Sequence, residues 1–536
     1  MVTRTRLIPS WRLPRGAALL AVLLSALPAA AQLGGESLEP DAQRVLLPVG
    51  PTGALALPGS WRLWGGYVGG MSVAAEDPAV GETTDAEHLI ESRLRLQPAL
   101  VLQGRGLIKL WRVAADTELH ITLGDLKAPV GLENDPRWIF REDQPVLRLT
   151  RLYAVAAAEH FVVRVGLDRS QFGLGLLANA GEDAPAGLVR QSAFGVGRHG
   201  DRVARGQVTL LPQGLVAGSR PGESLRAPLA IALAVDGIID DDSASWADGD
   251  RAVQFLGGLF SQLEAGHVGG GIAHRRQTHA DGGETVVNIG LLTGGVQHDL
   301  EGGRRLFMEV EAAGYLGHTN YVQSAIRKGN FDILSAGGAT RVGVEGPAYN
   351  ALVEVGFASG DANPFDDELH GFTFDRDYRL GLLMFQEGLR ATTAITAHNV
   401  ADPRFRGRPP RGYDALATDG GVTNARYFNP RAGWRVRDDV TLQLGYLVAT
   451  TDEPYADPFR SGLAGGGPVG PRGAVNQTYL GQELDFGVAW EPAWPPMGAR
   501  VRAQGAWFVP GEVFNDAEGQ AADSMMGGFL QVEGRW

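Results

Sequence analysis

Apolar and polar residues alternate along most of this chain, and the pattern is clear in its last stretch, FLQVEGRW (529–536). Leu530 and Val532 fall on one face of an extended strand, whereas Glu533 and Arg535 fall on the other. This period of two is typical of a β-strand whose faces meet different surroundings. The two surroundings are either a protein core and water, or lipid and a water-filled lumen.

The same alternation recurs over the whole chain after its first 59 residues. Clear examples are residues 89–103, 161–168, 305–316, 350–357, 439–448, 483–491 and 500–507. We recognise about 18 such segments (roughly 16–20), and each is close to the length that a tilted strand needs to cross a bilayer. The pattern predicts an all-β protein, a transmembrane antiparallel β-barrel.

The connections between these segments alternate between short and long. Residues 345–348 and 436–439 suit tight turns, whereas residues 360–375, 399–421 and 452–477 suit long loops. Short turns on one side and long loops on the other are typical of outer-membrane barrels, in which the turns are periplasmic and the loops extracellular.

The N-terminus predicts export. Four arginines precede the apolar run GAALLAVLLSAL (16–27), and small residues then lead to a cleavage site after residue 31. This is the pattern of a secretory signal peptide, with a membrane-anchoring segment as the alternative. We expect residues 32–59 to form a periplasmic extension or a plug, and residues 60–536 to form the barrel.

Composition narrows the possibilities further. Removing the four arginines of the signal peptide takes the formal net charge from −13 to −17, which argues against a nucleic-acid partner. The chain has no cysteine, so disulfides and thiolate chemistry are excluded, and its 75 glycines and 30 prolines suit strands and turns. Beyond the signal peptide no apolar run reaches the roughly 20 residues of a spanning helix, so a membrane location requires a barrel.

Aromatic residues near the strand ends suggest the two girdles that flank the apolar band of a barrel. The tryptophans assigned to these girdles are Trp61, Trp64, Trp490, Trp494, Trp507 and Trp536.

The polar faces of the strands supply the candidate functional residues. If the strands pair in chain order, their charged side chains point into a lumen, where they select solutes by charge or pair with each other. The predicted pore-lining residues are Arg93, Arg95, Arg164, Glu309, Glu311, Glu354, Glu483, Asp485, Arg500, Arg502 and Glu533. The arginines would form a basic wall whose guanidinium groups suit carboxylates. We expect Glu483 and Asp485 to lie beside Arg500 and Arg502.

Other motifs give weaker signals. The G-x-G-x-x-G match at 195–200 precedes a strand rather than a helix, so it does not predict nucleotide binding. His274 and His279 fall on opposite faces of a strand and cannot easily share a metal. Carboxylates in 239–250 and 359–368 could hold Ca²⁺, although solvated acidic loops are the simpler interpretation. We therefore assign no catalytic residue, metal or cofactor.

One region resembles a known family. Residues 353–385, VEVGFASGDANPFDDELHGFTFDRDYRLGLLMF, and residues 420–450 look like consecutive parts of alginate-export-like outer-membrane porins and of barrels associated with exopolysaccharide secretion. The resemblance covers roughly residues 350–450. It implies about 18 strands and an arginine-rich constriction that passes an anionic polysaccharide.

The sequence thus predicts a non-enzymatic channel in the outer membrane of a Gram-negative bacterium, passing or exporting hydrophilic molecules, with polysaccharide as the leading cargo. The alternatives are a general porin for small solutes with a loop folded into its lumen, a barrel hydrolase, and a secreted soluble β-protein. Expected partners are outer-membrane lipid, the barrel assembly machinery through the C-terminal strand, and periplasmic export components.

Overall fold

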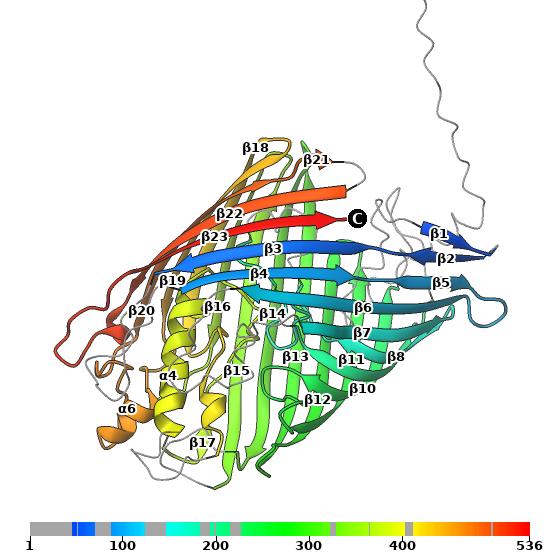
Figure 1. Ribbon diagram of the computed structural model, residues 1–536. Coiled ribbons are helices and arrows are strands. Elements are labelled where there is room, and N and C mark those ends of the chain that lie inside the picture. The colour runs from blue at the N-terminus through cyan, green and yellow to red at the C-terminus, as the bar shows by residue number, and fades with distance from the viewer. Residues whose placement is uncertain are drawn as a thin grey trace, which may run out of the picture.

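The protein is a closed barrel of 18 antiparallel strands (Figure 1), as the alternation predicts. A computed structural model describes residues 46–50, 52–69, 87–123, 146–182, 193–197, 200–214, 227–321, 329–363, 365–401, 411–494 and 497–536. The predicted signal peptide lies outside these residues, so both it and the division of the chain at residues 31 and 59 stay predictions.

Each barrel strand pairs with its neighbour in chain order, and the last strand pairs with the first. The strands are β3 (Gly59–Val68), β4 (Glu87–Leu96), β6 (Leu110–Leu123), β7 (Val146–Ala157), β8 (Phe161–Arg169), β9 (Arg202–Leu210), β10 (Leu229–Asp240), β11 (Arg251–Leu263), β12 (Gly266–Thr278), β13 (Glu284–Leu300), β14 (Arg304–Thr319), β15 (Phe331–Glu345), β16 (Tyr349–Ala358), β18 (Ala425–Arg437), β19 (Val440–Thr450), β20 (Tyr479–Trp490), β22 (Met497–Pro510) and β23 (Met525–Arg535). Closure leaves the barrel wall without a free edge, so its backbone groups are satisfied within the ladder.

The closing pair of strands ends at a tight contact. The N–H and carbonyl of Gly59 exchange hydrogen bonds of 3.0 Å with those of Trp536. The Trp536 indole covers Gly59 so closely that a Cβ atom there would lie 2.5 Å from the ring. Three short strands, β1 (Leu46–Val49), β2 (Gly53–Ala56) and β5 (Ala99–Gln103), extend the sheet beyond this point.

The connections differ at the two ends of the barrel, as predicted. Residues 264–265, 301–303 and 438–439 are tight turns at the end where the chain terminates. The long connections at the other end carry β17 (Glu368–Leu369), η2 (Met384–Leu389), α4 (Arg390–Ala401), η3 (Tyr413–Leu416), α6 (Pro458–Leu463) and η4 (Glu512–Phe514), while β21 (Ala493–Trp494) lies at the turn end. By the usual rule the turn end is periplasmic.

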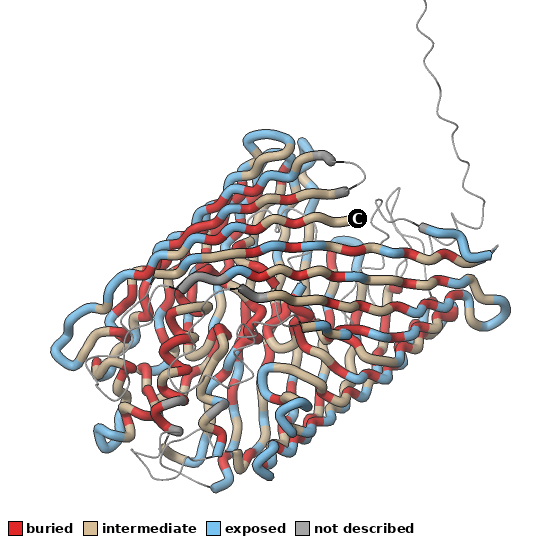
Figure 2. The backbone as a smooth tube through the Cα atoms, viewed as in Figure 1, coloured by how far each residue is buried: buried red, intermediate tan, exposed pale blue. Residues whose placement is uncertain are grey.

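Burial alternates along the strands because one side chain points out and the next points in (Figure 2). The outer face is a belt of exposed Leu, Val, Ile and Phe. Exposed aromatic side chains lie near both ends of the strands: Trp61, Trp111, Tyr349, Trp434 and Trp490 toward the turns, and Tyr67, Phe357, Phe428, Tyr446 and Trp507 toward the long loops. These are the two girdles expected of a membrane barrel.

The prediction that Trp64 belongs to an aromatic girdle is wrong. Trp64 points inward, is 5 % exposed and stacks on Phe529, with ring centroids 5.5 Å apart. Trp64 lies on the inner face of β3 together with Arg62, whereas Trp61 lies on the outer face. Position within the strand rather than residue type therefore decides which face a side chain occupies. The side chain of Trp494 lies outside what the structure describes. Among the described residues, no helix combines the length and apolar character needed to cross a bilayer.

Candidate functional site: the lumen

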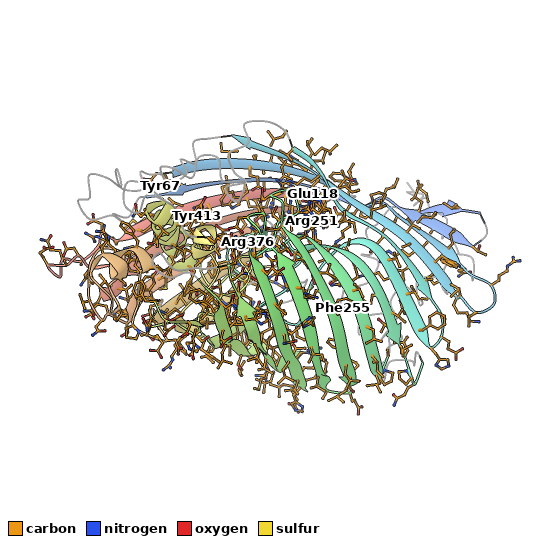
Figure 3. The ribbon with its side chains drawn as sticks, turned by 90° about the horizontal axis from the view of Figure 1, so that it is seen from below. Tyr67, Glu118, Arg251, Phe255, Arg376 and Tyr413 are labelled. Atoms are coloured by element: carbon orange, nitrogen blue, oxygen red, sulfur yellow. The ribbon has the colours of Figure 1, made fainter. Side chains whose placement is uncertain are left out.

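All eleven predicted pore-lining residues lie on the inner face; ten are buried and Glu309 is half-buried. Inner-face residues can be this inaccessible because long connections fold back into the barrel (Figure 3). We define the first inward segment as the described residues 170–182, 193–197 and 200–201, and the second as residues 371–389. Their contacts with the wall decide which part of the lumen stays open.

The first inward segment crosses the lumen. On one side, the N–H groups of Leu174, Gly175 and Leu176 converge on the Glu311 carboxylate of β14, with Gly175 at 3.0 Å and Leu176 at 3.2 Å. Gly175 has φ +90°, a conformation that glycine adopts without strain, which lets successive N–H groups form an anion-binding nest. On the far side, Arg502 of β22 donates to the Gly195 carbonyl at 2.6 Å.

Glu483 of β20 fixes the second inward segment. Its carboxylate accepts hydrogen bonds from the N–H groups of Leu382 (2.6 Å), Leu383 (3.0 Å) and Met384 (2.6 Å), where the helical run 384–401 begins. A negative charge is favourable there because the first N–H groups of a helix lack intrahelical partners. Gly381 permits the close approach, since a Cβ atom would lie 2.5 Å from Glu483 Oε1.

Glu354 of β16 provides a further fixed point for the same segment. It lies 2.7 Å from Arg341 and 2.6 Å from Arg431, and it accepts a hydrogen bond of 2.6 Å from the Tyr378 hydroxyl. Apolar side chains of the segment then fill the space between β15 and β23. This buried cluster includes Phe372, Phe374, Leu383, Met384, Phe385, Phe508 and Phe529. Much of that half of the lumen is therefore packed protein rather than water.

The predicted contacts between Glu483 or Asp485 and Arg500 or Arg502 do not form. The hairpin joining β20 and β22 sets Glu483 opposite Phe508 and Arg502 opposite Ala489. Arg500 instead pairs with Glu491 at 3.0 Å, and Arg502 donates to Gln531 of β23. The prediction was wrong because alternation gives the face of each residue but not the register, which the turn sets.

Open space remains on the opposite side, along β9 to β14. A cavity lies there between the wall and the first inward segment. Its lining is apolar at Phe172, Leu256 and Ile289 and polar at Arg205 and Arg275. These arginines are paired: Arg205 with Asp236 at 2.7 Å, and Arg275 with Asp241 at 2.6 Å.

The wall from β3 to β8 is basic. Its buried arginines are Arg62, Arg93, Arg95, Arg112, Arg151, Arg164 and Arg169, and its buried acids are Glu91, Asp116, Glu118 and Asp168. Arg169 pairs with Glu118 at 2.5 Å and Arg164 with Asp168 at 2.8 Å, but cations outnumber anions. Arg62 and Arg93 face each other directly across the β3–β4 ladder. The wall thus presents an excess of positive charge to the lumen.

The sequence prediction found Arg93, Arg95 and Arg164 on this wall and missed the other arginines. The alternation does not place Arg151 on the inner face, because the pairing of β7 with β6 shifts by one residue between Asp116 and Thr117. Thr150 and Arg151 are consecutive and both buried, so the period of two is interrupted there. Arg62 does follow the alternation of its strand, SWRLWGG, and could have been found.

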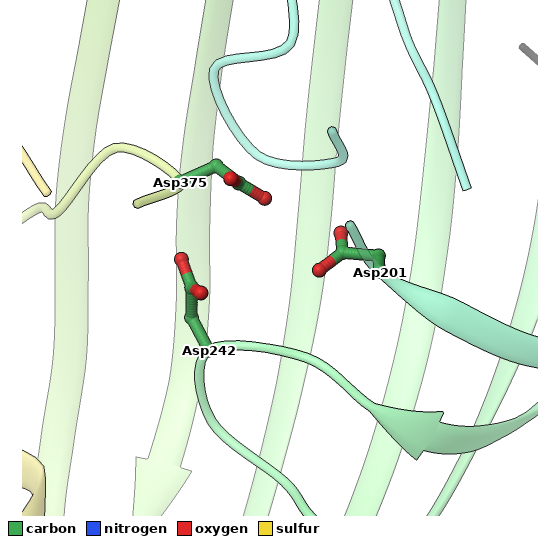
Figure 4. Close-up of side chains that lie close together, drawn as sticks. All are labelled: Asp201, Asp242 and Asp375. Atoms are coloured by element: carbon green, nitrogen blue, oxygen red, sulfur yellow. The ribbon is translucent and has the colours of Figure 1, made fainter. Parts of the chain in front are cut away.

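Three carboxylates from three different connections meet at the extracellular side of the cavity (Figure 4). Asp201, Asp242 and Asp375 can place oxygens within 4.8 Å of one another. Burial raises the pKa of Asp242 to about 7, and burial together with the neighbouring carboxylates raises the pKa of Asp201 and Asp375. Arg376 offsets part of the charge, with its Nε 3.0 Å from Asp242. The Ca²⁺ hypothesis for residues 239–250 thus concerns Asp242 together with partners from outside that loop.

The remaining motifs carry no visible site. His279 points inward and stacks on Tyr321, whereas His274 bonds Asn288 on the outer face, so the two lie apart as expected. Gly195 and Gly197 belong to the first inward segment, and residues 198–199 of that motif lie outside the described residues.

Comparisons with known proteins show the fold. No family model and no curated protein matches the chain. Pseudomonas aeruginosa OccK9 (OpdG) is similar in structure, with a TM-score of 0.51 and 11 % identity over 89 % of this chain and 98 % of that one. P. aeruginosa OpdK with vanillate has a TM-score of 0.48 and 10 % identity over 90 % and 98 %. P. aeruginosa OccK2 (OpdF) with glucuronate has 0.46 and 10 % over 89 % and 97 %.

These neighbours are outer-membrane porins, and the likeness gives no support to the narrower alginate-export resemblance of residues 350–450. Together with the closed barrel and its apolar outer belt, the fold places the chain in the outer membrane of a Gram-negative bacterium. The chain therefore has the fold of an outer-membrane β-barrel porin.

Proposed function

We propose that this protein is a channel for small hydrophilic solutes and that it prefers anions. The observation that carries the proposal is the division of the lumen by the inward segments, which fill the side between β15 and β23 and leave a cavity along β9 to β14. A small solute fits such a cavity, whereas a polysaccharide chain needs a continuous wide path. The small-solute alternative is thus better supported than polysaccharide export.

The charge of the wall supports the preference for anions. Arginines exceed acids from β3 to β8, and guanidinium groups donate paired hydrogen bonds that match carboxylates. Charged walls select ions by sign without any covalent chemistry, so the proposal requires no catalytic residue. The net negative charge of the whole chain does not oppose this, because selection depends on the charges at the passage.

Planar-bilayer recording tests the proposal. In a KCl gradient, we expect small discrete conductance steps and a reversal potential shifted toward chloride. Neutral oligosaccharides larger than a disaccharide should leave the current unchanged, because they cannot enter. Cation selectivity would refute the anion preference. Silence from inserted, folded protein would refute the channel, and block by long polysaccharides would restore the export hypothesis.

A further inference from the structure

The barrel wall beside the cavity is apolar on both of its faces. On β10, Ala232 and Ala234 point into the lumen, whereas Leu233 between them points outward. On β13, Ile289 and Leu291 also point into the lumen. Lumen-facing residues of a membrane barrel are ordinarily polar, because they meet water. Apolar residues on both faces of these strands indicate that the wall contacts an apolar group inside the barrel as well as lipid outside it.

The first inward segment covers this wall only in part. Leu177 of the segment, Leu256 of β11 and Leu291 of β13 pack around buried Ala273 and Ile289. All three leucines nevertheless stay half-buried, and all three line the cavity. Since contact between hydrocarbon and water is unfavourable, the cavity favours an apolar group over water.

Aromatic rings close the cavity toward the turn end of the barrel. Phe172 of the first inward segment packs edge-on against Phe260 of β11, with ring centroids 5.8 Å apart. Phe260 lies two residues nearer the turn than Gly258, which lines the cavity. Because the cavity lies inside the barrel, between the wall and the first inward segment, a small solute can enter it, whereas a folded partner protein cannot.

Polar groups at the edge of the cavity suit the rest of such a solute. Gln207 of β9 is 6 % exposed and lines the cavity. Its amide donates to the Thr209 hydroxyl at 2.9 Å, but its Oε1 accepts no hydrogen bond from the described residues. A buried acceptor without a partner is costly, so a hydrogen-bond donor on the solute would favour binding. Arg205 and Arg275 are each paired with an aspartate, so this binding does not depend on a net charge of the solute.

We propose that the cavity binds the short branched hydrocarbon group of a water-soluble solute, with Leu177, Leu256 and Leu291 as the contact surface. The inference rests on the proposed channel function and adds the class of solute that the channel favours. Contacts of this kind are non-directional and cover a small area, so the solute is held weakly and can leave again.

The amino acids leucine and asparagine, added as free solutes, test the inference. Their side chains have nearly the same shape and their charges are identical, so they differ in the hydrocarbon character of one group. Saturation-transfer NMR of the full-length protein in lipid nanodiscs gives both dissociation constants independently of conduction. Wild type should bind leucine about tenfold more tightly than asparagine, since only leucine removes a hydrocarbon group from water.

Two variants locate the binding. Leu256→Asn replaces hydrocarbon by an amide of nearly the same size and should reduce the preference for leucine to less than about threefold. Ile333→Asn is the control, because Ile333 is half-buried on the inner face of β15 but lies outside the cavity lining; it should keep the tenfold preference. If Leu256→Asn fails to fold, Ala234→Leu fills the cavity and should weaken leucine binding about tenfold.

The outcomes separate this inference from the proposed function. Equal affinity of wild type for leucine and asparagine would overturn the inference, and so would a preference that survives unchanged in Leu256→Asn or in Ala234→Leu. A loss of preference in Ile333→Asn as large as that in Leu256→Asn would overturn the assignment to this cavity. Electrical silence of wild type would overturn the channel, and the two dissociation constants would still decide the binding site.

Discussion

Replacing Glu483 by glutamine should release the second inward segment. Both oxygens of the carboxylate are used, Oε1 by the N–H groups of Leu382 and Leu383 and Oε2 by that of Met384. The amide of glutamine keeps one oxygen, so two hydrogen bonds survive as neutral ones. The third becomes a contact between two donors.

The magnitude follows from these three bonds. A hydrogen bond to a charged group contributes about 1.5–3 kcal/mol, compared with about 0.5–1.5 kcal/mol for a neutral one. Weakening two bonds by about 1 kcal/mol each and losing the third at about 2 kcal/mol gives about 4 kcal/mol. Since about 1.4 kcal/mol is a factor of ten, the segment should open roughly a thousandfold more often.

Hydrogen exchange of the amides at 378–389, in folded protein in detergent, measures this opening. Glu483→Gln should accelerate exchange there by two to three orders of magnitude and leave the amides of β11 and β12 unchanged. Glu518→Gln is the control, because it removes the same charge from an exposed position outside the second inward segment. Exchange within threefold of wild type in Glu483→Gln would refute the anchoring role.

Three further predictions concern the wall, the backbone and pH. Arg93→Gln should reduce anion selectivity, measured as the reversal potential, at little cost in stability, because Arg93 directly faces Arg62; an unchanged potential would remove this arginine from the passage. Gly166→Ala should cost about 1–3 kcal/mol, seen as earlier loss of heat-resistant gel migration, because φ is +137° and a Cβ atom would lie 2.2 Å from the Leu152 carbonyl. Gly206→Ala is the control, because Gly206 lies on the neighbouring strand β9, opposite Val165, with open space around it. Burial and the neighbouring carboxylates raise the pKa of Asp375, so the folded protein keeps a proton that the unfolded chain loses above about pH 4. Docking of the second inward segment should therefore be strongest below about pH 4 and weaken as the pH rises, and Asp242, whose pKa is raised to about 7, adds to this loss. Hydrogen exchange of 372–384 at pH 5 and pH 8 should show this, and Asp375→Asn should flatten the difference.

The sequence predicted the wall better than the interior. Strand number and the inward direction of residues such as Glu311 and Glu354 follow from a period of two, because burial on one face forces that pattern. The hydrogen-bond partners of these residues cannot be predicted from that period. Glu311 binds the backbone of residues 174–176 and Glu354 binds Tyr378, and both partners lie in connections that carry no periodic signal.

The two glutamates that hold the inward segments do so through backbone N–H groups of those segments. Glu311 and Glu483 would therefore form the same hydrogen bonds with almost any sequence that can adopt the same local backbone conformation. Attachment and selectivity are thus encoded in different atoms of these segments, so the side chains bordering the passage can change while the docking stays intact. A barrel built in this way can acquire a new solute preference through substitutions in a connection alone, with its strands untouched.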